Sequence, residues 1–324
     1  MVLLTSRDPK PTRDVWHAGE KQMQNALGVA DKMRNRGAVV IRDFMPDQHR
    51  AFFADQRFVV LSALDANGQP WAFLRTGPQG FMSSPSAEQL CITSRPTVFE
   101  RPDLRLKARA KISVLGIEFE TKRRNRLNGT ISQVQGDRMT VTVDQSFGNC
   151  PRYIHARDHL TTVERRPELS EGPHLTDTDI AQITSADALF IASRAPDIGD
   201  DRRAGVDINH RGGLPGFVQV TKDRTLVVPD YDGNKFFNTI GNILLDPRVS
   251  LMFFDFDAGN VITLAGTARV NMDTAKMAAE YGVQRVIHVA PNHVTRAKAA
   301  LPFTSKLRSL SRDAPMLGTV EVDQ

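Results

Sequence analysis

The segment Arg211-Gly-Gly-Leu-Pro-Gly-Phe217 is the most informative part of this sequence, because its pattern also occurs 136 residues earlier as Arg75-Thr-Gly-Pro-Gln-Gly-Phe81. A second pair of matching segments, 117–130 and 254–267, keeps an offset of 137 residues and shares the ending Leu-x-Gly-Thr. Two nearly equal offsets in the same order indicate that the chain contains one structural unit twice. The alternative is that short glycine-containing turns recur by chance in a chain rich in strands.

Each copy is predicted to form antiparallel β-structure. In the first copy, the apolar runs 58–64 and 71–74 flank Ala66-Asn67-Gly68, and Asn-Gly between such runs favours a tight hairpin in which both central residues have positive φ. Alternating Thr and Val predict a second hairpin between 129–134 and 138–143. Short strands joined by tight turns indicate a small barrel or sandwich. The second copy is expected to form strands at 188–192, 216–220, 225–228, 249–254 and 261–264.

Helices are expected at few places. Apolar residues at helical spacing in 16–36 and 45–54 predict a helical N-terminal extension. The same spacing predicts a helix within 232–247, which Pro247 ends, and a last helix is expected near 272–283. We therefore divide the chain into a helical extension (1–50), a first barrel half (51–160), a linker (161–180) and a second barrel half with a C-terminal tail (181–324).

The composition excludes several classes of protein. The chain has 324 residues, of which 40% are apolar and 24% charged, as in ordinary globular domains. No apolar run approaches the roughly 20 residues that a membrane-spanning helix needs. The N-terminus lacks the apolar core of a signal peptide, so we expect a cytoplasmic protein. Cys91 and Cys150 support neither a disulfide framework nor a structural zinc site.

The charge pattern favours an anionic ligand. The formal net charge is +5, and the positive excess is concentrated in 101–126. Such a field suits nucleic acid, a phosphorylated metabolite or a phosphate-bearing cofactor, and composition alone leaves these open. No Rossmann or P-loop glycine motif and no serine hydrolase elbow occurs. His155 and His159 lack the glutamate and third ligand of a zinc site, so they are interpreted as a pair on a helix surface.

Residues 209–217 and 230–249 closely resemble the pyridoxamine 5′-phosphate oxidase-like family of FMN-binding split barrels. Segments 16–20, 47–50, 122–129 and 145–154 are similar to its long-chain, flavin-nucleotide-binding branch. The resemblance implies a mainly β fold with peripheral helices, in which two tandem split barrels form a pseudo-dimer within one chain. It also implies FMN in the groove between the barrels.

The two copies differ in the part that resembles the cofactor site. The second copy has the pattern Asn-Lys-x-x-Asn-x-x-x-Asn at 234–242, whereas the corresponding stretch 97–103 has lost it. The resemblance therefore implies one site, built mainly on the second half. Whether whole chains pair again as a homodimer stays open.

The resemblance assigns most of the cofactor contacts to the second half. Arg211 and Lys235 are expected to hold the FMN phosphate, with Asn238 and Asn242 as hydrogen-bond donors on one helix face with Lys235. Solvated turn and helix positions are the alternative for all four. Further candidates are Gly212 on the turn with Arg211, Ser193 at a strand end, His210 as a proton shuttle or a solvated turn residue, and Tyr231, which with Trp71 could flank the flavin ring or pack in the core.

The first half offers a basic run at 122–126. Arg124 and Arg126 could reach across the groove to a phosphate of FMN or of a nicotinamide nucleotide. A charged cluster on a strand edge is the alternative. A nucleic-acid patch is disfavoured, because no exposed aromatic residues interleave the run. Gln145, Asn149 and Arg152 could line the same groove, and Cys150 is expected to be buried.

Together these features predict an FMN-dependent oxidoreductase in which the flavin carries the hydride or the electrons. A small-molecule substrate or a donor such as NAD(P)H is the expected partner, with no nucleic acid, membrane or metal, and no covalent catalytic residue. The alternative is a flavin-nucleotide-binding carrier, sensor or electron-transfer partner without turnover of its own. A true pyridoxamine phosphate oxidase is disfavoured, because the C-terminus lacks the Arg-x-His-type substrate signature of those enzymes.

Overall fold

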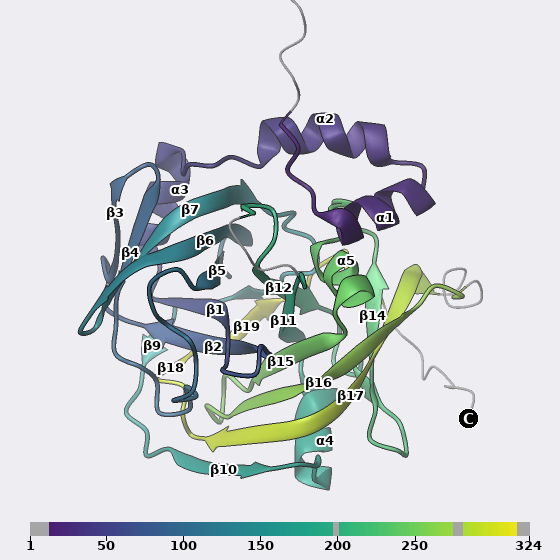
Figure 1. Cartoon of the computed structure of the whole chain (residues 1–324). Coiled ribbons are helices and arrows are strands. Elements are labelled where there is room, and N and C mark those ends of the chain that lie inside the picture. Colours follow the sequence, from purple (N-terminus) through teal and green to yellow (C-terminus); the bar gives the residue numbers. More distant parts are fainter. Residues whose placement is uncertain (1–12, 197–200, 275–280, 316–324) are drawn as a thin grey trace, which may run out of the picture.

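Two large antiparallel sheets form most of the structure, a computed structural model that describes residues 13–196, 201–274 and 281–315 (Figure 1). The strands of the first sheet follow the order β2-β1-β5-β6-β7-β4-β3, and those of the second follow β12-β11-β15-β16-β17-β14-β13. Position by position, the two orders are the same. The fold is therefore mainly β and consists of two tandem split barrels, as the internal repeat predicts.

The strands have the following bounds. The first barrel comprises β1 (Phe58–Leu64), β2 (Pro70–Thr76), β3 (Met82–Ser86), β4 (Gln89–Thr93), β5 (Lys111–Glu118), β6 (Arg123–Gln135) and β7 (Arg138–Gly148). The second comprises β11 (Ala188–Arg194), β12 (Val206–Gly212), β13 (Gln219–Val220), β14 (Leu226–Tyr231), β15 (Arg248–Phe254), β16 (Val261–Asn271) and β17 (Val283–Lys298). The short strands are β8 (Ala156–Arg157), β9 (Thr161–Thr162), β10 (Glu168–Gly172), β18 (Phe303–Thr304) and β19 (Leu307–Ser309).

The repeat extends to the register of the strands. Arg75 in β2 pairs with Val59 in β1, and Arg211 in β12 pairs with Leu189 in β11, so the two arginines occupy equivalent positions. Arg211 therefore lies near the end of a strand and not on a turn. In the segment predicted as a linker, β10 pairs with β17 and extends the second sheet.

The hairpin predicted between β1 and β2 is confirmed, but its turn differs from the expected one. Only Gly68 has a positive φ, +77°, and Asn67 does not. The carboxylate of Asp65 accepts hydrogen bonds from the backbone N–H groups of Asn67 (2.8 Å) and Gln69 (3.0 Å). This side chain stabilises the loop without requiring a left-handed asparagine.

The helical N-terminal extension contains more than one helix. Residues 16–36, predicted as one helix, form parts of α1 (Ala18–Ala26) and α2 (Ala30–Val40), because Gly28 adopts a left-handed φ of +64° between them. α3 (Asp47–Asp55) follows, and α4 (Asp177–Ser185) precedes the second barrel. α4 was not expected, although Thr176 and Asp179 form a capping box at its start.

Two further predictions about helices differ from the structure or fall outside it. His155 and His159 are not on a helix, since the chain is extended at β8 and Gly213 O lies 2.8 Å from His155 Nε2. The helix expected at 272–283 falls largely on residues 275–280, outside the described residues, as do the N-terminal residues 1–12.

A shared core joins the barrels. β1 and β11 are buried along nearly their whole length, because each strand has one face in its own barrel and the other toward the neighbouring barrel. Phe58 and Leu115 from the first barrel belong to the same apolar cluster as Phe190 and Met252 from the second. Such continuous apolar runs are expected for strands that are covered on both sides.

The N-terminal helices pack across both barrels beside α5 (Asn238–Leu245) (Figure 1). Trp16 packs against Phe236 with ring centroids 5.0 Å apart, and Phe147 of β7 contacts the same phenyl ring at 5.9 Å. Where α1 meets α5, an added Cβ at Gly19 would lie 2.0 Å from the carbonyl oxygen of Gly241. The close approach of the two helices therefore requires glycine on both.

We predict that Gly241→Ala destabilises the protein by about 1–3 kcal/mol, the usual cost of overpacking. Its Cβ would lie 2.6 Å from the backbone nitrogen of Glu20 in α1, which cannot move aside as a side chain can. Helix propensity alone would stabilise the variant by about 1 kcal/mol. A lower urea unfolding midpoint would therefore confirm the clash with α1, and a higher midpoint would contradict it. Gly233→Ala, which meets no atom within 4 Å, is the control.

Candidate functional site

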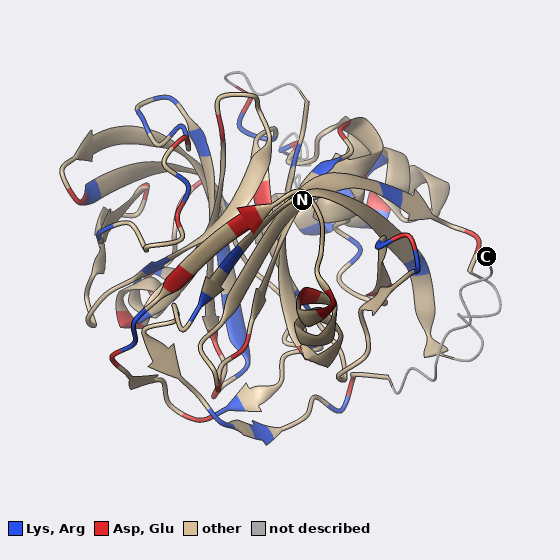
Figure 2. Ribbon diagram, turned by 90° about the horizontal axis from the view of Figure 1, so that it is seen from below, with Lys and Arg blue, Asp and Glu red and all other residues tan. Residues whose placement is uncertain are grey.

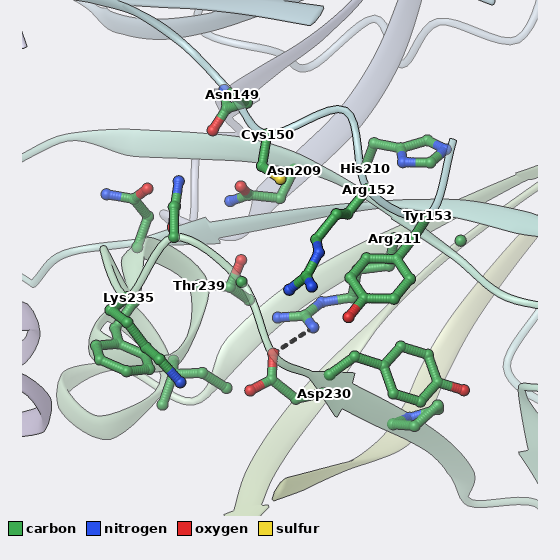
Figure 3. Close-up of a pocket in the computed structure, with 18 of the residues that line it drawn as sticks. Asn149, Cys150, Arg152, Tyr153, Asn209, His210, Arg211, Asp230, Lys235 and Thr239 are labelled. Carbon is green, nitrogen blue, oxygen red and sulfur yellow. Dashed lines mark hydrogen bonds and ion pairs between the residues drawn. The ribbon is translucent and has the colours of Figure 1, made fainter. Parts of the chain in front are cut away.

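A pocket lies between the two barrels, with an empty space of about 830 Å³ that includes its opening to solvent (Figure 3). The second barrel lines it with residues of β12 and β14, with the loop that follows β14 and with the start of α5. Arg124 of β6 and residues 149–153 after β7 line it from the first half of the chain. Both halves thus contribute to one pocket, as the resemblance implies.

The pocket carries more cations than carboxylates. Five cationic side chains line it, together with one carboxylate, Asp230: they are Arg124, Arg152, Arg211, Lys235 and Arg285. Asp230 pairs with both Arg211 (2.6 Å) and Arg285 (2.7 Å), and Figure 3 shows the contact with Arg211. Arg152 and Lys235 both pair with Asp232. The surplus of positive charge suits an anionic ligand.

Several buried polar atoms of this pocket have no partner among the described residues. They are Asn149 Nδ2, Asn209 Nδ2, His210 Nε2, Arg211 Nε and Tyr231 Oη. A buried polar group left unpaired costs about 1–3 kcal/mol, so this concentration points to a ligand that completes the hydrogen bonds. Most of these atoms are N–H donors, and the cations beside them also donate. The donor set fits a ligand with phosphate and carbonyl oxygens.

The backbone around the pocket is strained at three positions. Tyr153, Lys235 and Phe237 line the pocket and have φ angles of 65°, 65° and 64°, in the left-handed region. Such conformations of residues other than glycine cluster at functional sites. They also correct the predicted helix, because α5 begins only at Asn238 and Lys235 precedes it.

The structure brings most of the predicted site residues together. Seven of the ten line the pocket, namely Arg124, His210, Arg211, Gly212, Tyr231, Lys235 and Asn238. Asn149, Arg152 and Cys150 line it as well, and Cys150 is only half-buried. Trp71 lies elsewhere, buried with its indole N–H donated to Asp65 and with Arg101 stacked 4.2 Å above its ring.

The other three predicted residues form a buried network beside the pocket. Asn242 Nδ2 donates to Ser193 Oγ (3.0 Å) and to Asp207 (2.8 Å). Arg126 forms an ion pair with the same aspartate at 2.9 Å. Gln145, also expected in the groove, instead donates its amide to the carbonyl of Val15 (2.8 Å).

The basic segment 101–126 does not form a strand-edge cluster at its C-terminal end. β6, which carries Arg124 and Arg126, lies between β5 and β7 in the sheet. Further back, Arg101 pairs with Asp103 (2.9 Å) and Lys111 with Asp144 (2.8 Å). In the view of Figure 2, basic and acidic segments are interspersed along strands and loops.

His210 is buried on β12 and is not a solvated turn residue. Arg124 donates to its carbonyl oxygen (2.9 Å), and the same Nη1 lies 3.3 Å from its Nδ1. Burial, followed by the charge of Arg124, lowers the pKa of His210 well below its ordinary value of 6.5. The imidazole is therefore neutral at pH 7.

Sequence reasoning missed Glu20, which reaches the site from the N-terminal extension. Its carboxylate accepts from Asn238 Nδ2 and from the backbone N–H of His17 (3.0 Å). Burial, with a contribution from Asp207, raises the pKa of Glu20 well above its ordinary 4.5. A capping box, His17-x-x-Glu20, was the available signal, but it predicts only a helix start.

Three other residues of the pocket were also missed. Tyr153 packs against Tyr231 with ring centroids 5.2 Å apart. Asp230 and Arg285 form the ion pair that closes one wall, and they come from β14 and β17. Their pairing follows from sheet register, where Asp230 lies opposite Arg285, and no short motif records it.

A split barrel with a cationic, donor-rich pocket defines the class of the protein. Residues 45–171 match the model of the pyridoxamine 5′-phosphate oxidase family, so this stretch of the chain is similar to that family. The matched stretch contains the first barrel, whereas most pocket residues lie in the second.

Solved structures similar to this chain correspond to part of its length. HupZ of Group A Streptococcus is 13% identical and covers 41% of this chain and 100% of its own, with a TM-score of 0.29. An FAD-binding protein of Mycobacterium smegmatis is 16% identical, covers 39% and 98%, and has a TM-score of 0.27. One of Mesorhizobium loti is 12% identical, covers 40% and 98%, and has a TM-score of 0.27. No curated protein matches the chain.

Among the described residues, no helix is long and apolar enough to cross a membrane. Within the same parts of the chain, no group of three or more His, Cys, Asp or Glu side chains could hold a metal ion.

The neutral state of His210 predicts a pH dependence of stability. The unfolded chain takes up a proton near pH 6.5 and the folded chain does not, so the free energy of unfolding falls as the pH drops below 6.5. One such group contributes up to about 1.4 kcal/mol per pH unit. The raised pKa of Glu20 acts in the opposite sense. The measurement is therefore the difference between the protein and His210→Gln in urea unfolding from pH 8 to 5.5, and equal slopes would contradict the prediction.

Proposed function

We propose that this chain binds FMN in the pocket between its barrels and acts as an FMN-dependent oxidoreductase. The observation that carries the proposal is the group of unpartnered buried donors beside a surplus of cations. FMN offers a dianionic phosphate and a ring with carbonyl and nitrogen acceptors, which match this donor set. The family of residues 45–171 supports the same ligand.

The phosphate is assigned to Arg211 and Lys235 at the start of α5. Arg211 Nε has no partner among the described residues, although its Nη1 is bound by Asp230. Lys235 lies three residues before α5, and the first N–H groups of a helix lack intrahelical partners and favour anions. Asn238 Nδ2 is held by Glu20, so the side chain of Asn238 is fixed before any ligand binds.

The first barrel also has the arginine of the repeat, but this arginine is bound by other residues of the same barrel. Arg75, the equivalent of Arg211, has the carboxylate of Glu100 2.6 Å from its Nε and also donates to the carbonyl of Ser94. Where the second barrel has α5, residues 97–103 are irregular and Phe99 is buried in the shared core. We therefore propose one FMN per chain.

Bound FMN would accept or donate a hydride or electrons, with NAD(P)H as the proposed donor. The residues of the chain would bind, orient and shield it: Tyr153 and Tyr231 offer an aromatic wall, and the neutral His210 can hold a proton at one ring nitrogen. We also propose a cytoplasmic location, where such a donor is available. The alternative function is a flavin-nucleotide carrier, sensor or electron-transfer partner without turnover.

The first test is the visible spectrum of the purified protein, with mass spectrometry of the small molecule released on denaturation. A yellow protein that releases FMN supports the proposal. A colourless protein that does not take up added FMN contradicts it.

We predict that Arg211→Ala together with Lys235→Ala abolishes retention of FMN, since charge-assisted hydrogen bonds are worth about 1.5–3 kcal/mol each. The fold should survive, because Asp230 keeps Arg285 as its partner. Flavin content per chain is measured after gel filtration. The matched control is Arg75→Ala with Glu100→Ala, which removes both partners of the equivalent ion pair. Its flavin content should equal that of the unsubstituted chain, and full retention by the Arg211 and Lys235 variant would refute the assignment.

Stopped-flow mixing of the FMN-loaded protein with NADH or NADPH separates the two functions. For an oxidoreductase we expect the flavin absorbance to bleach within seconds and to recover on exposure to an acceptor. A carrier would bleach no faster than free FMN under the same conditions. That second result would favour the alternative while leaving the binding site intact.

A further inference from the structure

Arg124 is a pocket residue whose charge has no counter-ion among the described residues. The other four cations of the pocket are each paired, Arg211 and Arg285 with Asp230, and Arg152 and Lys235 with Asp232. Arg124 makes hydrogen bonds only to neutral groups, the carbonyls of Cys150 (2.9 Å) and His210 (2.9 Å) and the ring of His210. Arg124 is half-buried, and partial removal of a cation from water without a counter-ion is costly, so its charge favours an anionic ligand.

The guanidinium of Arg124 is held in place before any anion arrives. Its Nε donates to one carbonyl and its Nη1 to another, which leaves Nη2 without a partner among the described residues at a pocket wall. A planar guanidinium fixed on two sides loses little conformational freedom when its third nitrogen binds a carboxylate or phosphate oxygen. Burial, Arg126 and Arg211 also lower the pKa of Arg124 to about 10, an effect that a bound anion would reverse.

Alternation along β6 explains why this arginine points at the pocket. Arg124 and Arg126 are two residues apart and so lie on the same face of the strand, toward the second barrel. Arg126 meets a carboxylate there, Asp207 of β12. Arg124 meets His210 of the same strand, which is neutral. The second barrel therefore supplies a carboxylate to Arg126 and only a neutral ring to Arg124.

Arg124 and Arg211 line the same pocket, but they come from different barrels and are held by different partners. Neighbouring residues of a strand point to opposite faces, so His210 and Arg211 direct their side chains to different sides of β12. Arg124 is bonded to His210, and Arg211 is bonded to Asp230 of β14. The pocket therefore contains two separately anchored guanidinium groups, of which that of Arg211 is already paired with a carboxylate and that of Arg124 is not.

We propose that Arg124 forms a second anion subsite of the pocket, which binds the carboxylate or phosphate of a second molecule beside the flavin nucleotide. The inference rests on the proposed function for the identity of the first ligand. The second molecule is then an anionic substrate or electron donor, and the first half of the chain contributes a residue that binds it. This gives the first barrel a direct role in ligand selection.

The test uses the FMN-loaded protein titrated with inorganic phosphate at constant ionic strength, followed by the flavin spectrum and by calorimetry. We expect one phosphate per chain, and a Kd that rises about tenfold or more in Arg124→Gln, as the loss of one charge-assisted hydrogen bond requires. Arg123→Gln is the matched control, because the adjacent Arg123 is exposed and its guanidinium lies over the ring of Phe52, 5.3 Å from the centroid. Its Kd should change less than twofold.

Three results would overturn the proposal. An unchanged Kd for phosphate in Arg124→Gln would show that Arg124 binds no anion. Loss of FMN itself from Arg124→Gln would place Arg124 in the nucleotide site. The third result is tighter binding of FAD than of FMN, a preference that Arg124→Gln removes, together with no binding of phosphate to the loaded protein. It would mean that the second anion is a phosphate of the nucleotide.

Failure of the proposed function has a different signature. If the protein does not bind FMN at all, the same phosphate titration is carried out on the flavin-free chain. Arg124→Gln should still remove one phosphate, while Arg211→Ala with Lys235→Ala should remove another and leave the first. Phosphate binding that neither variant changes would overturn the second subsite as well.

Discussion

The ion pair between Arg126 and Asp207 fixes how the two barrels meet. It joins β6 of the first barrel to β12 of the second at 2.9 Å, with both side chains buried. A buried ion pair is less costly when further hydrogen bonds satisfy its carboxylate. Asp207 meets this condition, because it also accepts from Asn128 (2.8 Å) and from Asn242 of α5 (2.8 Å). One carboxylate therefore sets the position of both barrels and of the helix that borders the pocket.

The N-terminal extension acts on the same place from the other side. Glu20 of α1 bonds Asn238 at the start of α5, and Gly19 allows α1 to approach the backbone of Gly241. α5 is thus held by Asp207 below and by α1 above. The first barrel has no corresponding helix after β4, and residues 97–103 instead place Phe99 in the shared core. The N-terminal extension therefore packs on the helix that only the second barrel has, and the pocket lies beside that helix.

The sequence was sufficient for the architecture because repeats and strand patterns are local signals. The offset between Arg75 and Arg211 predicts equivalent positions, and both arginines do pair at the same point of their sheets. The local backbone was less predictable. Gly28 separates two helices that the spacing of apolar residues predicts as one. Lys235 lies before α5, because Lys235 and Phe237 adopt left-handed backbone conformations. The sequence does not indicate these conformations, since neither residue is glycine. Ion pairs such as Asp230 with Arg285 depend on register between distant strands and leave no motif.

The basic run 122–126 also shows how strand geometry changes an interpretation that rests on sequence alone. Residues 122–126 suggest one patch of positive charge, but strand alternation divides it. Arg123 is exposed, whereas Arg124 and Arg126 face the second barrel. Arg126 is neutralised by Asp207 and is structural. Arg124, two residues away, meets the uncharged His210, and its charge remains available. The difference lies in the partner strand: β12 offers an aspartate at one point of contact and a neutral histidine at the next, so the barrel interface that assembles the protein also leaves one cation for a ligand.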